Sequence, residues 1–367
     1  MKKVVLFITV YLAITITFTV LALRDTNSIK EKLYVLNWDE YIDEELITTF
    51  EEMYDCEIVY EVADSNETMY SRVATEYAPY DIIVPSDYMI SQMKEEDMLL
   101  ELDYTKLSNY SKDKFNDKLM SLIDHDVATI SNYLVPYFWG SLGIMYNKNV
   151  LTETQIARIQ TDGFKVLFDQ SFSSAMGMYA SSRDSIACAL MANGFSVNTK
   201  NIDELAIAEA SLGQMRYKAW ATDDLKVGVA SGKYACALVY SGDFFDVLYS
   251  ALEEEVDINF DIYCPTENNN IFFDAMVIPK TSQNTELAYK FIDFMLVHEN
   301  SLANASYVGY SPTLKSVYEA MCEDPEMMEV TSNKAYNPGQ LNGEIYAYLG
   351  KDIYDLYEDI YKRVCGK

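Results

Sequence analysis

Strand-like apolar segments alternate with amphipathic helical segments from Lys32 onward, and this alternation most restricts the folds open to the chain. It is typical of a mostly parallel sheet with helices packed on its faces, so the predicted fold class is α/β. The elements expected in this first part are strands at 32–37, 57–62 and 80–84 and helices at 43–54 and 66–77.

Polar loops follow all three of these strands. They lie at Trp38, at 64–67 and at 85–88, and parallel strands bring such loops to one edge of a sheet. Asn66 and Ser86 are predicted to cap the helices that begin in the second and third loops. Because ligands of open α/β sheets bind at this edge, the three loops are candidates for a binding site.

A second alternation of strands and helices occupies the rest of the chain, and two long aromatic segments, 133–147 and 271–279, interrupt it. We interpret both as extended chain that crosses between two lobes, because 367 residues are enough for two cores. No low-complexity linker is present, so the lobes are expected to meet at a hinge. The other expected elements are strands at 165–168, 176–180, 234–240 and 258–264 and helices at 185–193, 204–219, 286–295 and 343–364.

Residues 1–30 are predicted to form a signal or membrane-anchor segment. The twenty residues from Val4 to Leu23 carry no charge, follow two lysines and are numerous enough to span a bilayer. An uncleaved anchor and a cleaved export signal are both open at this point, with 20–22 as the cleavage site in the second case. In either case the rest of the chain is expected outside the cytoplasm, in the periplasm or on the outer face of the cell membrane.

The net charge restricts the partners. It is −29 for the whole chain, and residues 1–30 contribute +3, so the difference of −32 belongs to the exported part. A surface of this sign repels the phosphates of nucleic acids and attracts cations. Nucleic acid is therefore not expected as a partner, and a positively charged ligand is favoured. The alternative interpretation is that the excess acid keeps the protein soluble.

Histidine and cysteine give little basis for a metal centre or a catalytic triad. His125 and His298 are the only histidines. The segment 228–234 has too few residues between its glycines for a phosphate loop. No metal, no other cofactor and no catalytic residue is predicted. The cysteines form no C-x-x-C pair and are interpreted as small buried hydrophobes; they are Cys56, Cys188, Cys236, Cys264, Cys322 and Cys365.

The first of the three loops has the composition of a cation site. It places Trp38 and Tyr41 beside two acids, Asp39 and Glu40. Aromatic faces attract cations, and carboxylates form charge-assisted hydrogen bonds with amines. This loop therefore suits a cationic ligand with an aliphatic middle.

Five segments, in order, resemble the bacterial spermidine/putrescine-binding proteins of ABC transporters. The resemblance runs from about Leu33 to the C-terminus. The five segments are Asn37-Trp38-Asp39-Glu40-Tyr41, Ser65-Asn66-Glu67-Thr68-Met69-Tyr70, Tyr80-Asp81-Ile82-Ile83-Val84-Pro85-Ser86, Val135-Pro136-Tyr137-Phe138-Trp139-Gly140 and Phe273-Asp274-Ala275-Met276-Val277-Ile278-Pro279.

This resemblance implies a two-lobed fold like that of the type II periplasmic binding proteins. Two crossing strands would form the hinge, and the ligand would lie in the cleft between the lobes. Lobe 1 is then expected to comprise 31–137 with 274–313, and lobe 2 to comprise 138–273 with 314–367. The implied protein is a monomer and not an enzyme. It would bind putrescine or spermidine outside the cytoplasm and deliver it to the permease subunits of an ABC transporter.

The ligand-binding residues implied by the resemblance are those at matching positions. They are Trp38, Glu40, Tyr41, Ser86, Tyr88, Asp184, Tyr240, Phe272, Asp274, Tyr310 and Tyr346.

Several of these positions depart from the family pattern. Tyr240 and Phe272 stand where tryptophans are usual, and Tyr346 stands where a glutamine is usual. Around Arg183 the family carries two acids, whereas this chain keeps Asp184 alone. Because a site with fewer acids suits a dication better than a trication, putrescine is favoured over spermidine.

Two other classes of function are weighed against this one. A membrane-anchored polyamine sensor would use the same residues to couple binding to signalling, and a neighbouring gene for a kinase or cyclase would indicate it. A secreted hydrolase would use two of the many carboxylates, and it would turn over a sugar or an ester.

Overall fold

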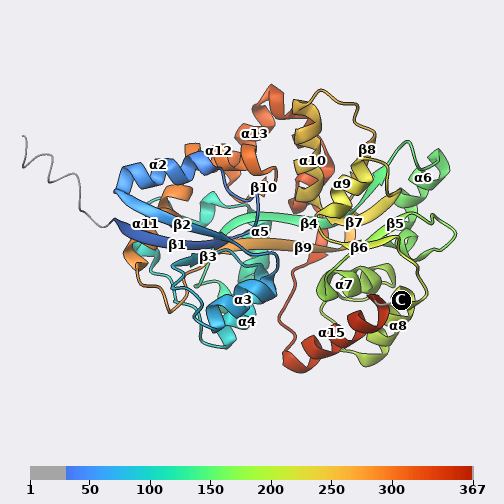
Figure 1. The fold of residues 1–367 in the computed structure, drawn as a ribbon, viewed down its shortest axis with the longest axis horizontal. Coiled ribbons are helices and arrows are strands. Elements are labelled where there is room, and N and C mark those ends of the chain that lie inside the picture. Colours follow the sequence, from blue (N-terminus) through green and yellow to red (C-terminus); the bar gives the residue numbers. More distant parts are fainter. Residues whose placement is uncertain (1–29, 366–367) are drawn as a thin grey trace, which may run out of the picture.

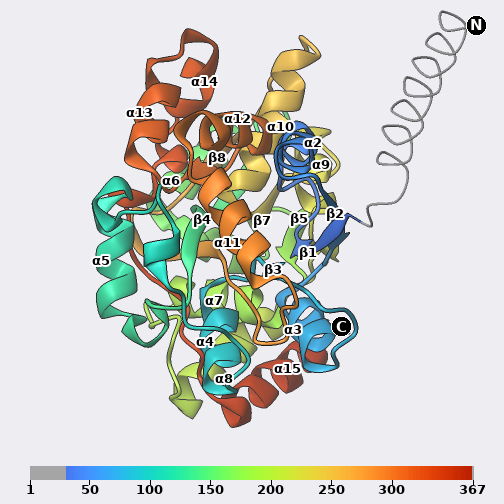
Figure 2. The same cartoon turned by 90° about the vertical axis from the view of Figure 1, so that its left-hand side faces the viewer.

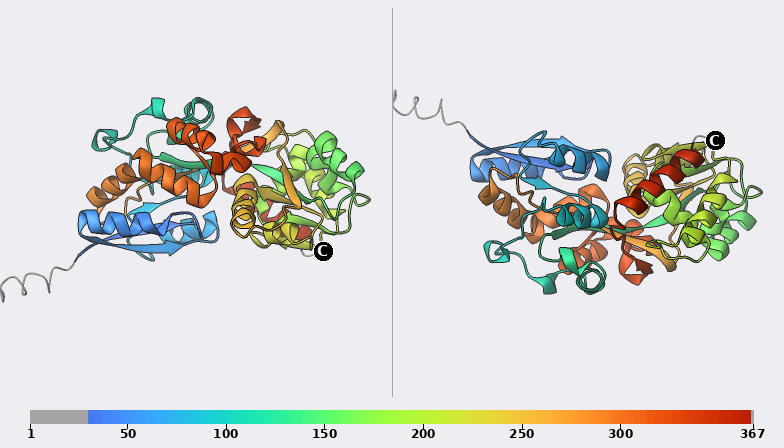
Figure 3. Two further views of the ribbon diagram at one scale, coloured as in Figure 1. Left: turned by 90° about the horizontal axis from the view of Figure 1, so that it is seen from above. Right: turned by 90° about the horizontal axis from the view of Figure 1, so that it is seen from below.

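The computed structural model describes residues 30–365, so the predicted signal or anchor segment lies outside the described residues apart from Lys30. Two lobes stand side by side, and two long strands run from one into the other (Figure 1). Views from above and below show the same two bodies joined at the middle (Figure 3). The α/β class is confirmed. Within 30–365 no helix combines the length and apolar composition that a membrane crossing needs.

The first lobe is built on a small parallel sheet in the order β2-β1-β3. Helices α3 and α4 lie below this sheet and α2 and α12 above it, in two views at right angles (Figures 1 and 2). The elements of this lobe are β1 (Glu31–Asn37), α2 (Glu44–Tyr54), β2 (Cys56–Val62), α3 (Asn66–Ala74), β3 (Ile82–Ile83), α4 (Asp87–Glu95), α5 (Asp117–His125), α11 (Thr285–Met295), α12 (His298–Val308) and β10 (Ser311–Pro312).

The second lobe is built on a larger sheet, in the order β11-β9-β4-β7-β5-β6, with β8 and β10 also paired to β4. Helices α9 and α10 lie above this sheet and α7, α8 and α15 below it (Figure 1). The elements are β4 (Val135–Asn147), α6 (Glu153–Asp162), β5 (Met176–Tyr179), α7 (Ser182–Ala192), α8 (Ile202–Gly213), β6 (Ala219–Ala221), α9 (Asp224–Ala230), β7 (Cys236–Tyr240), α10 (Ser241–Glu253), β8 (Phe260–Tyr263), β9 (Glu267–Met276), β11 (Asn342–Glu344) and α15 (Lys351–Cys365). Helix α13 (Lys315–Glu323) packs on α12 and β10 of the first lobe, and α14 (Met328–Thr331) packs on α13 and α10.

Strands β4 and β9 connect the two lobes. They pair antiparallel from Val135–Met276 to Ser141–Ile271. Beyond Ser141, β4 pairs with β7 and β8 of the second lobe. At the other end, an isolated bridge joins Val277, just after β9, to β3 of the first lobe. The two predicted crossings are therefore strands that belong to both lobes.

Three predicted elements of the second lobe are wrong in type or extent. Residues 165–168 lie in a 3-10 helix, Gly163–Phe168, which packs against α7. The helix expected at 204–219 ends at Gly213, because Ala219 pairs with β5 as the start of β6. The helix expected from residue 343 begins at Lys351, because 342–344 pair with β9 as β11. In each case tertiary contacts override the local pattern.

Two smaller predictions also need correction. Ser65, not Asn66, caps α3, and its hydroxyl accepts a hydrogen bond from the Thr68 amide. Of the six cysteines, which are all free, four are buried as expected, whereas Cys322 is exposed and Cys365 is half-buried. Both of these lie on amphipathic helices, where one face meets solvent.

Asp81 ties the first sheet to the loop before α11. Its carboxylate is buried and accepts hydrogen bonds from the backbone amides of Tyr34 (3.0 Å), Gln283 (2.9 Å) and Asn284 (2.7 Å) and from the Ser282 hydroxyl (2.8 Å). These four bonds fix the chain where it returns to the first lobe after β9. Asp81 thus holds together segments about 200 residues apart.

Replacing Asp81 with alanine is expected to lower the free energy of unfolding by roughly 3 kcal/mol, because three backbone amides and a hydroxyl lose a buried charged acceptor. Urea denaturation measures the change. The control is Asp117→Ala, which removes an ion pair to Lys315 from a side chain that is 91% exposed and should cost less than ~1 kcal/mol. Equal losses in the two variants would contradict the role given to Asp81.

Candidate ligand-binding site between the lobes

Asp274 lies on crossing strand β9 and is 5% exposed. Its Oδ2 accepts a hydrogen bond from the Tyr41 hydroxyl at 2.7 Å, and its Oδ1 accepts one from the Ser86 hydroxyl at 2.6 Å. Burial raises the pKa of Asp274 to about 6, and the bonds from Ser86 and Tyr41 partly oppose that rise. The carboxylate is therefore held in place by hydroxyls that orient it without neutralising it.

Ser86 reaches Asp274 because it does not use its side chain as a cap. It stands at the N-cap position of α4, as predicted, but makes no side-chain capping bond there. Its hydroxyl also accepts from the Asn66 amide at 3.1 Å, and its backbone amide donates to Asn66 Oδ1 at 2.9 Å. The Trp38 indole donates to the Val84 carbonyl at 2.8 Å. The three polar loops therefore meet, as the alternation predicted.

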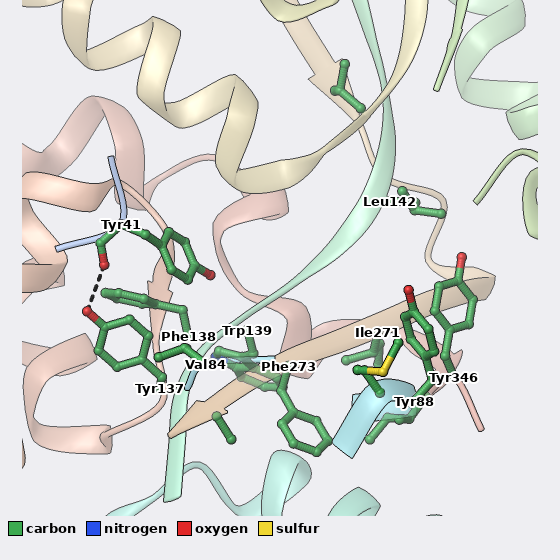
Figure 4. Close-up of a cluster of buried hydrophobic side chains, with 14 of the residues drawn as sticks. Tyr41, Val84, Tyr88, Tyr137, Phe138, Trp139, Leu142, Ile271, Phe273 and Tyr346 are labelled. Atoms are coloured by element: carbon green, nitrogen blue, oxygen red, sulfur yellow. Dashed lines mark hydrogen bonds between the residues drawn. The ribbon is translucent and has the colours of Figure 1, made fainter. Parts of the chain in front are cut away.

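Tyr41 is fixed through its backbone. Its carbonyl accepts a hydrogen bond from the Tyr137 hydroxyl at 2.7 Å (Figure 4), and that hydroxyl accepts one from the Asn304 side chain at 2.8 Å. Just before it, Glu40 adopts a left-handed backbone with φ of 50°. The Glu40 side chain is exposed, and among residues 30–365 it forms no hydrogen bond or ion pair. Glu40 thus lies at the outer end of the loop.

The second lobe contributes Asp184, near the start of α7 and 5% exposed. Its Oδ1 accepts hydrogen bonds from the hydroxyls of Tyr240 (2.7 Å) and Tyr346 (3.1 Å). Ser181 caps α7, because its hydroxyl accepts a hydrogen bond from the Asp184 amide at 3.2 Å. Asp184 thus remains the acid beside Arg183.

The ring of Tyr346 forms a cation–π contact with Arg183. Its ring centroid lies 4.0 Å from the guanidinium carbon of Arg183, which also donates to the Val197 carbonyl at 2.7 Å and to Asn198 Oδ1 at 2.8 Å. The ring of Tyr88, from the first lobe, meets Tyr346 edge to face with centroids 6.2 Å apart (Figure 4). Tyr346 therefore fills the end of the site beside Asp184.

Sequence reasoning missed a third acid, Asp243 on α10, which is 6% exposed. Its Oδ1 accepts from the Tyr310 hydroxyl at 2.9 Å, and its Oδ2 accepts from the Tyr240 amide at 3.2 Å. Burial raises its pKa to about 6, although nearby Lys226 acts in the opposite direction. Ser241-Gly242-Asp243 directly follows strand β7, which is the pattern that identified the loops of the first lobe.

Aromatic rings connect the acids. Ring centroids lie 5.1 Å apart between Tyr41 and Tyr310, 6.2 Å between Tyr310 and Phe272, and 4.7 Å between Phe272 and Tyr240. Nine of the eleven predicted residues join one network through these ring contacts and the hydrogen bonds above; they are Tyr41, Ser86, Tyr88, Asp184, Tyr240, Phe272, Asp274, Tyr310 and Tyr346. Trp38 and Glu40 lie beside it on the first loop.

The electrostatics of this network favour a cation. Among residues 30–365, none of Asp184, Asp243 and Asp274 forms an ion pair with a lysine or arginine. Lys226 acts on Asp243 from nearby without forming an ion pair with it, and burying carboxylates without a paired counter-charge is unfavourable. In the described part of the chain no cluster of His, Cys, Asp and Glu is arranged to hold a metal ion. Amines held between separated carboxylates and rings fit this arrangement.

Two lobes joined by paired crossing strands, with site residues from both, define a solute-binding protein of the type II periplasmic class. More narrowly, the chain belongs to the family of bacterial extracellular solute-binding proteins, whose family model matches residues 45–335.

Known relatives agree with the resemblance found in the sequence, which is thereby confirmed. The spermidine/putrescine ABC transporter substrate-binding protein of Streptococcus pneumoniae is 32% identical, with a TM-score of 0.75 over 92% of this chain and 99% of that one. The spermidine/putrescine-binding periplasmic protein of Salmonella typhimurium is 25% identical over 340 residues, 91% of each chain. The putrescine-binding periplasmic protein of Pseudomonas aeruginosa is 27% identical over 305 residues, 80% of this chain and 82% of that one.

Proposed function

We propose that this protein binds a linear polyamine between its lobes and delivers it to the permease subunits of an ABC transporter. The observation that carries the proposal is the set of three buried acids, Asp184, Asp243 and Asp274, arranged around a row of aromatic rings. The ammonium groups of a polyamine would supply the counter-charge, and its methylenes would lie along the rings. The names of the relatives support this ligand class.

Two kinds of contact would contribute most of the affinity. Each hydrogen bond between an ammonium and a carboxylate contributes roughly 1.5–3 kcal/mol, and each ring face adds ~0.5–2 kcal/mol. Asp274 and Asp243 are the acids we assign to the ammonium groups of a diamine. We assign the network residues to the ligand wall, with Trp38 and Glu40 as contacts at its outer edge.

The location and domain organisation complete the proposal. Residues 1–30 would export the chain or anchor it in the membrane, so that the protein acts outside the cytoplasm as a monomer. We propose lobe boundaries near 137 and 273 on the crossing strands, with 274–313 returning to the first lobe and 314–367 to the second. Strand β4 passes from pairing with β9 to pairing with β7 and β8 of the second lobe after Ser141.

Calorimetric titration tests the proposed ligand class. The chain from residue 31 onward is titrated with putrescine, cadaverine, spermidine and spermine, and at least one is expected to bind with micromolar or better affinity. Glutamate and a neutral diol of the same length serve as ligand controls and should give no heat of binding. The absence of binding by all four polyamines would overturn the proposal.

Putrescine is expected to bind about tenfold more tightly than spermidine. Asp184 already accepts two tyrosine hydroxyls, and Arg183 lies under the ring of Tyr346. A third ammonium would therefore meet little free carboxylate and a nearby positive charge. The same titrations measure the ratio, and Tyr346→Phe, which frees one acceptor position on Asp184, should shift it toward spermidine. Tighter binding of spermidine by the unmodified chain would contradict the preference.

A further inference from the structure

Gly242 is the second residue of α10, and its backbone does not require glycine. It is absent from the described residues with positive φ, so an alanine fits its backbone conformation. Alanine in a helix is favoured over glycine by roughly 1 kcal/mol. The reason for glycine at 242 must therefore be a contact.

The contact is with the ring of Tyr310. A Cβ added to Gly242 would lie 2.0 Å from Tyr310 Cε2, 2.1 Å from Cζ and 2.2 Å from Cδ2, where ordinary contacts are 3.4–4 Å. The tyrosine ring thus rests directly on the first turn of α10. Any side chain at 242 would displace the ring or the helix.

The ring has little freedom to move aside. Its hydroxyl donates to Asp243 at 2.9 Å, and its face and edges meet Tyr41, Phe272 and Phe138 with centroids 5.1, 6.2 and 6.4 Å away. A rotation that cleared a methyl group would break the bond to Asp243 and the contact with Tyr41. To make room for a methyl group, the Tyr310 ring and helix α10 must therefore move apart as rigid units.

The contact between Gly242 and Tyr310 joins the two lobes close to their connecting strands. Tyr310 follows α12 of the first lobe, whereas α10 packs on β7, α9 and β8 of the second. The next residue, Ser311, pairs with Trp139 on crossing strand β4. The contact thus lies next to the strands that join the lobes, where a separation of about one ångström is magnified toward the far ends of two rigid bodies.

We propose that Gly242 is a positioning residue for lobe closure, because its lack of a side chain lets the Tyr310 ring of the first lobe pack directly on α10 of the second. This contact sets how closely the lobes approach and so how firmly they enclose the ligand. This inference rests on the proposed polyamine-binding function, which it deepens. It predicts that a single methyl group at 242 opens the site without unfolding either lobe.

The test compares Gly242→Ala with Gly228→Ala in the full-length chain, purified in detergent. Gly228, on α9, is a matched control because a Cβ there would lie 2.2 Å from the ring of Tyr234, within the second lobe. Gly242→Ala is expected to raise the putrescine Kd at least tenfold, mostly through faster dissociation, with the unliganded Tm within about 2 °C. Gly228→Ala should lower the Tm and change Kd less than threefold.

A double-mutant cycle identifies the cause. In a Tyr310→Ala background the methyl group has room, so Gly242→Ala should change Kd and the dissociation rate less than twofold. Stopped-flow tryptophan fluorescence gives the dissociation rate. If Tyr310→Ala binds too weakly to measure, the contrast between Gly242→Ala and Gly228→Ala decides.

The outcomes separate this inference from the function on which it rests. If the unmodified chain binds no polyamine, the proposed function fails. If it binds putrescine and Gly242→Ala binds equally well, or if Gly242→Ala has the same effect with and without the Tyr310 ring, the positioning role of Gly242 is overturned while the function stands.

Discussion

Asp274→Asn is expected to weaken putrescine binding by about 10- to 100-fold. The variant keeps the size of the side chain and removes its charge, so an ammonium loses a charge-assisted hydrogen bond worth roughly 1.5–3 kcal/mol. Tyr41 donates to one carboxylate oxygen of Asp274 and Ser86 donates to the other. An asparagine would present its NH2 group to one of these two hydroxyls. Calorimetric titration at pH 7.5 measures the loss.

Three comparisons make this result interpretable. Asp117→Asn removes an acid that is 91% exposed and should leave Kd unchanged. Glu40→Gln removes an exposed acid on the first loop and should change Kd only a few fold. The unliganded Asp274→Asn variant should melt no lower than the unmodified chain at pH 8, since burying an ionised Asp274 is unfavourable. Equal affinity of Asp274→Asn and the unmodified chain would show that the ligand lies elsewhere.

The tyrosine hydroxyls explain how these acids stay available to a ligand. Asp274 accepts from Tyr41, Asp243 from Tyr310, and Asp184 from Tyr240 and Tyr346. A neutral hydroxyl satisfies a carboxylate oxygen and fixes its direction but leaves its charge in place. A lysine or arginine at the same distance would compete with the ammonium groups. This arrangement gives four of the 30 tyrosines of the chain a role beyond packing.

The three parallel strands of the first lobe and the helices between them could be predicted because their local patterns and tertiary contacts agree, whereas α5 and α12 were not predicted. The strands of the parallel sheet are apolar, the helices are amphipathic, and polar loops mark their ends, so the contacts of Trp38 with Val84 and of Asn66 with Ser86 follow from topology. In the second lobe, 342–344 look helical together with α15 yet pair with β9. The sequence around 342–344 gives no sign that this segment pairs with β9.

The site could be predicted only where a loop or a family motif marked it. Asp243 is one of 57 acidic residues in the sequence. What singles it out is a hydroxyl from Tyr310, 67 residues away in the chain. Glu40 shows the reverse case, because its motif predicts an amine contact while its side chain lies exposed. Burial and long-range hydrogen bonds, which the sequence does not display, decide between such acids.

Putrescine affinity is expected to be nearly constant from pH 8 to pH 6.5 and to fall about 30-fold between pH 6 and pH 5. The pKa of Asp274 and that of Asp243 are each raised from 3.8 to about 6, chiefly by burial. Lys226 lowers and Asp223 raises the pKa of Asp243, whereas Ser86 and Tyr41 lower that of Asp274. Protons therefore compete with ammonium groups at both acids, and each acid contributes up to about tenfold per unit.

The same shifts fix the sign of the stability change in the unliganded protein. Because both folded-state pKa values lie above those of the unfolded chain, the folded state binds protons more tightly, and stability rises as the pH falls from 7 through 6 toward 4. Titrations at pH 8, 7, 6 and 5.5 in buffers of different ionisation enthalpy count the protons released on binding, which should rise to about 1.5 at pH 5.5. Asp274→Asn should release about half as many at the same pH. An affinity that does not change between pH 8 and pH 5 would mean that neither acid meets the ligand, since a buried carboxylate in contact with an ammonium cannot also keep a proton.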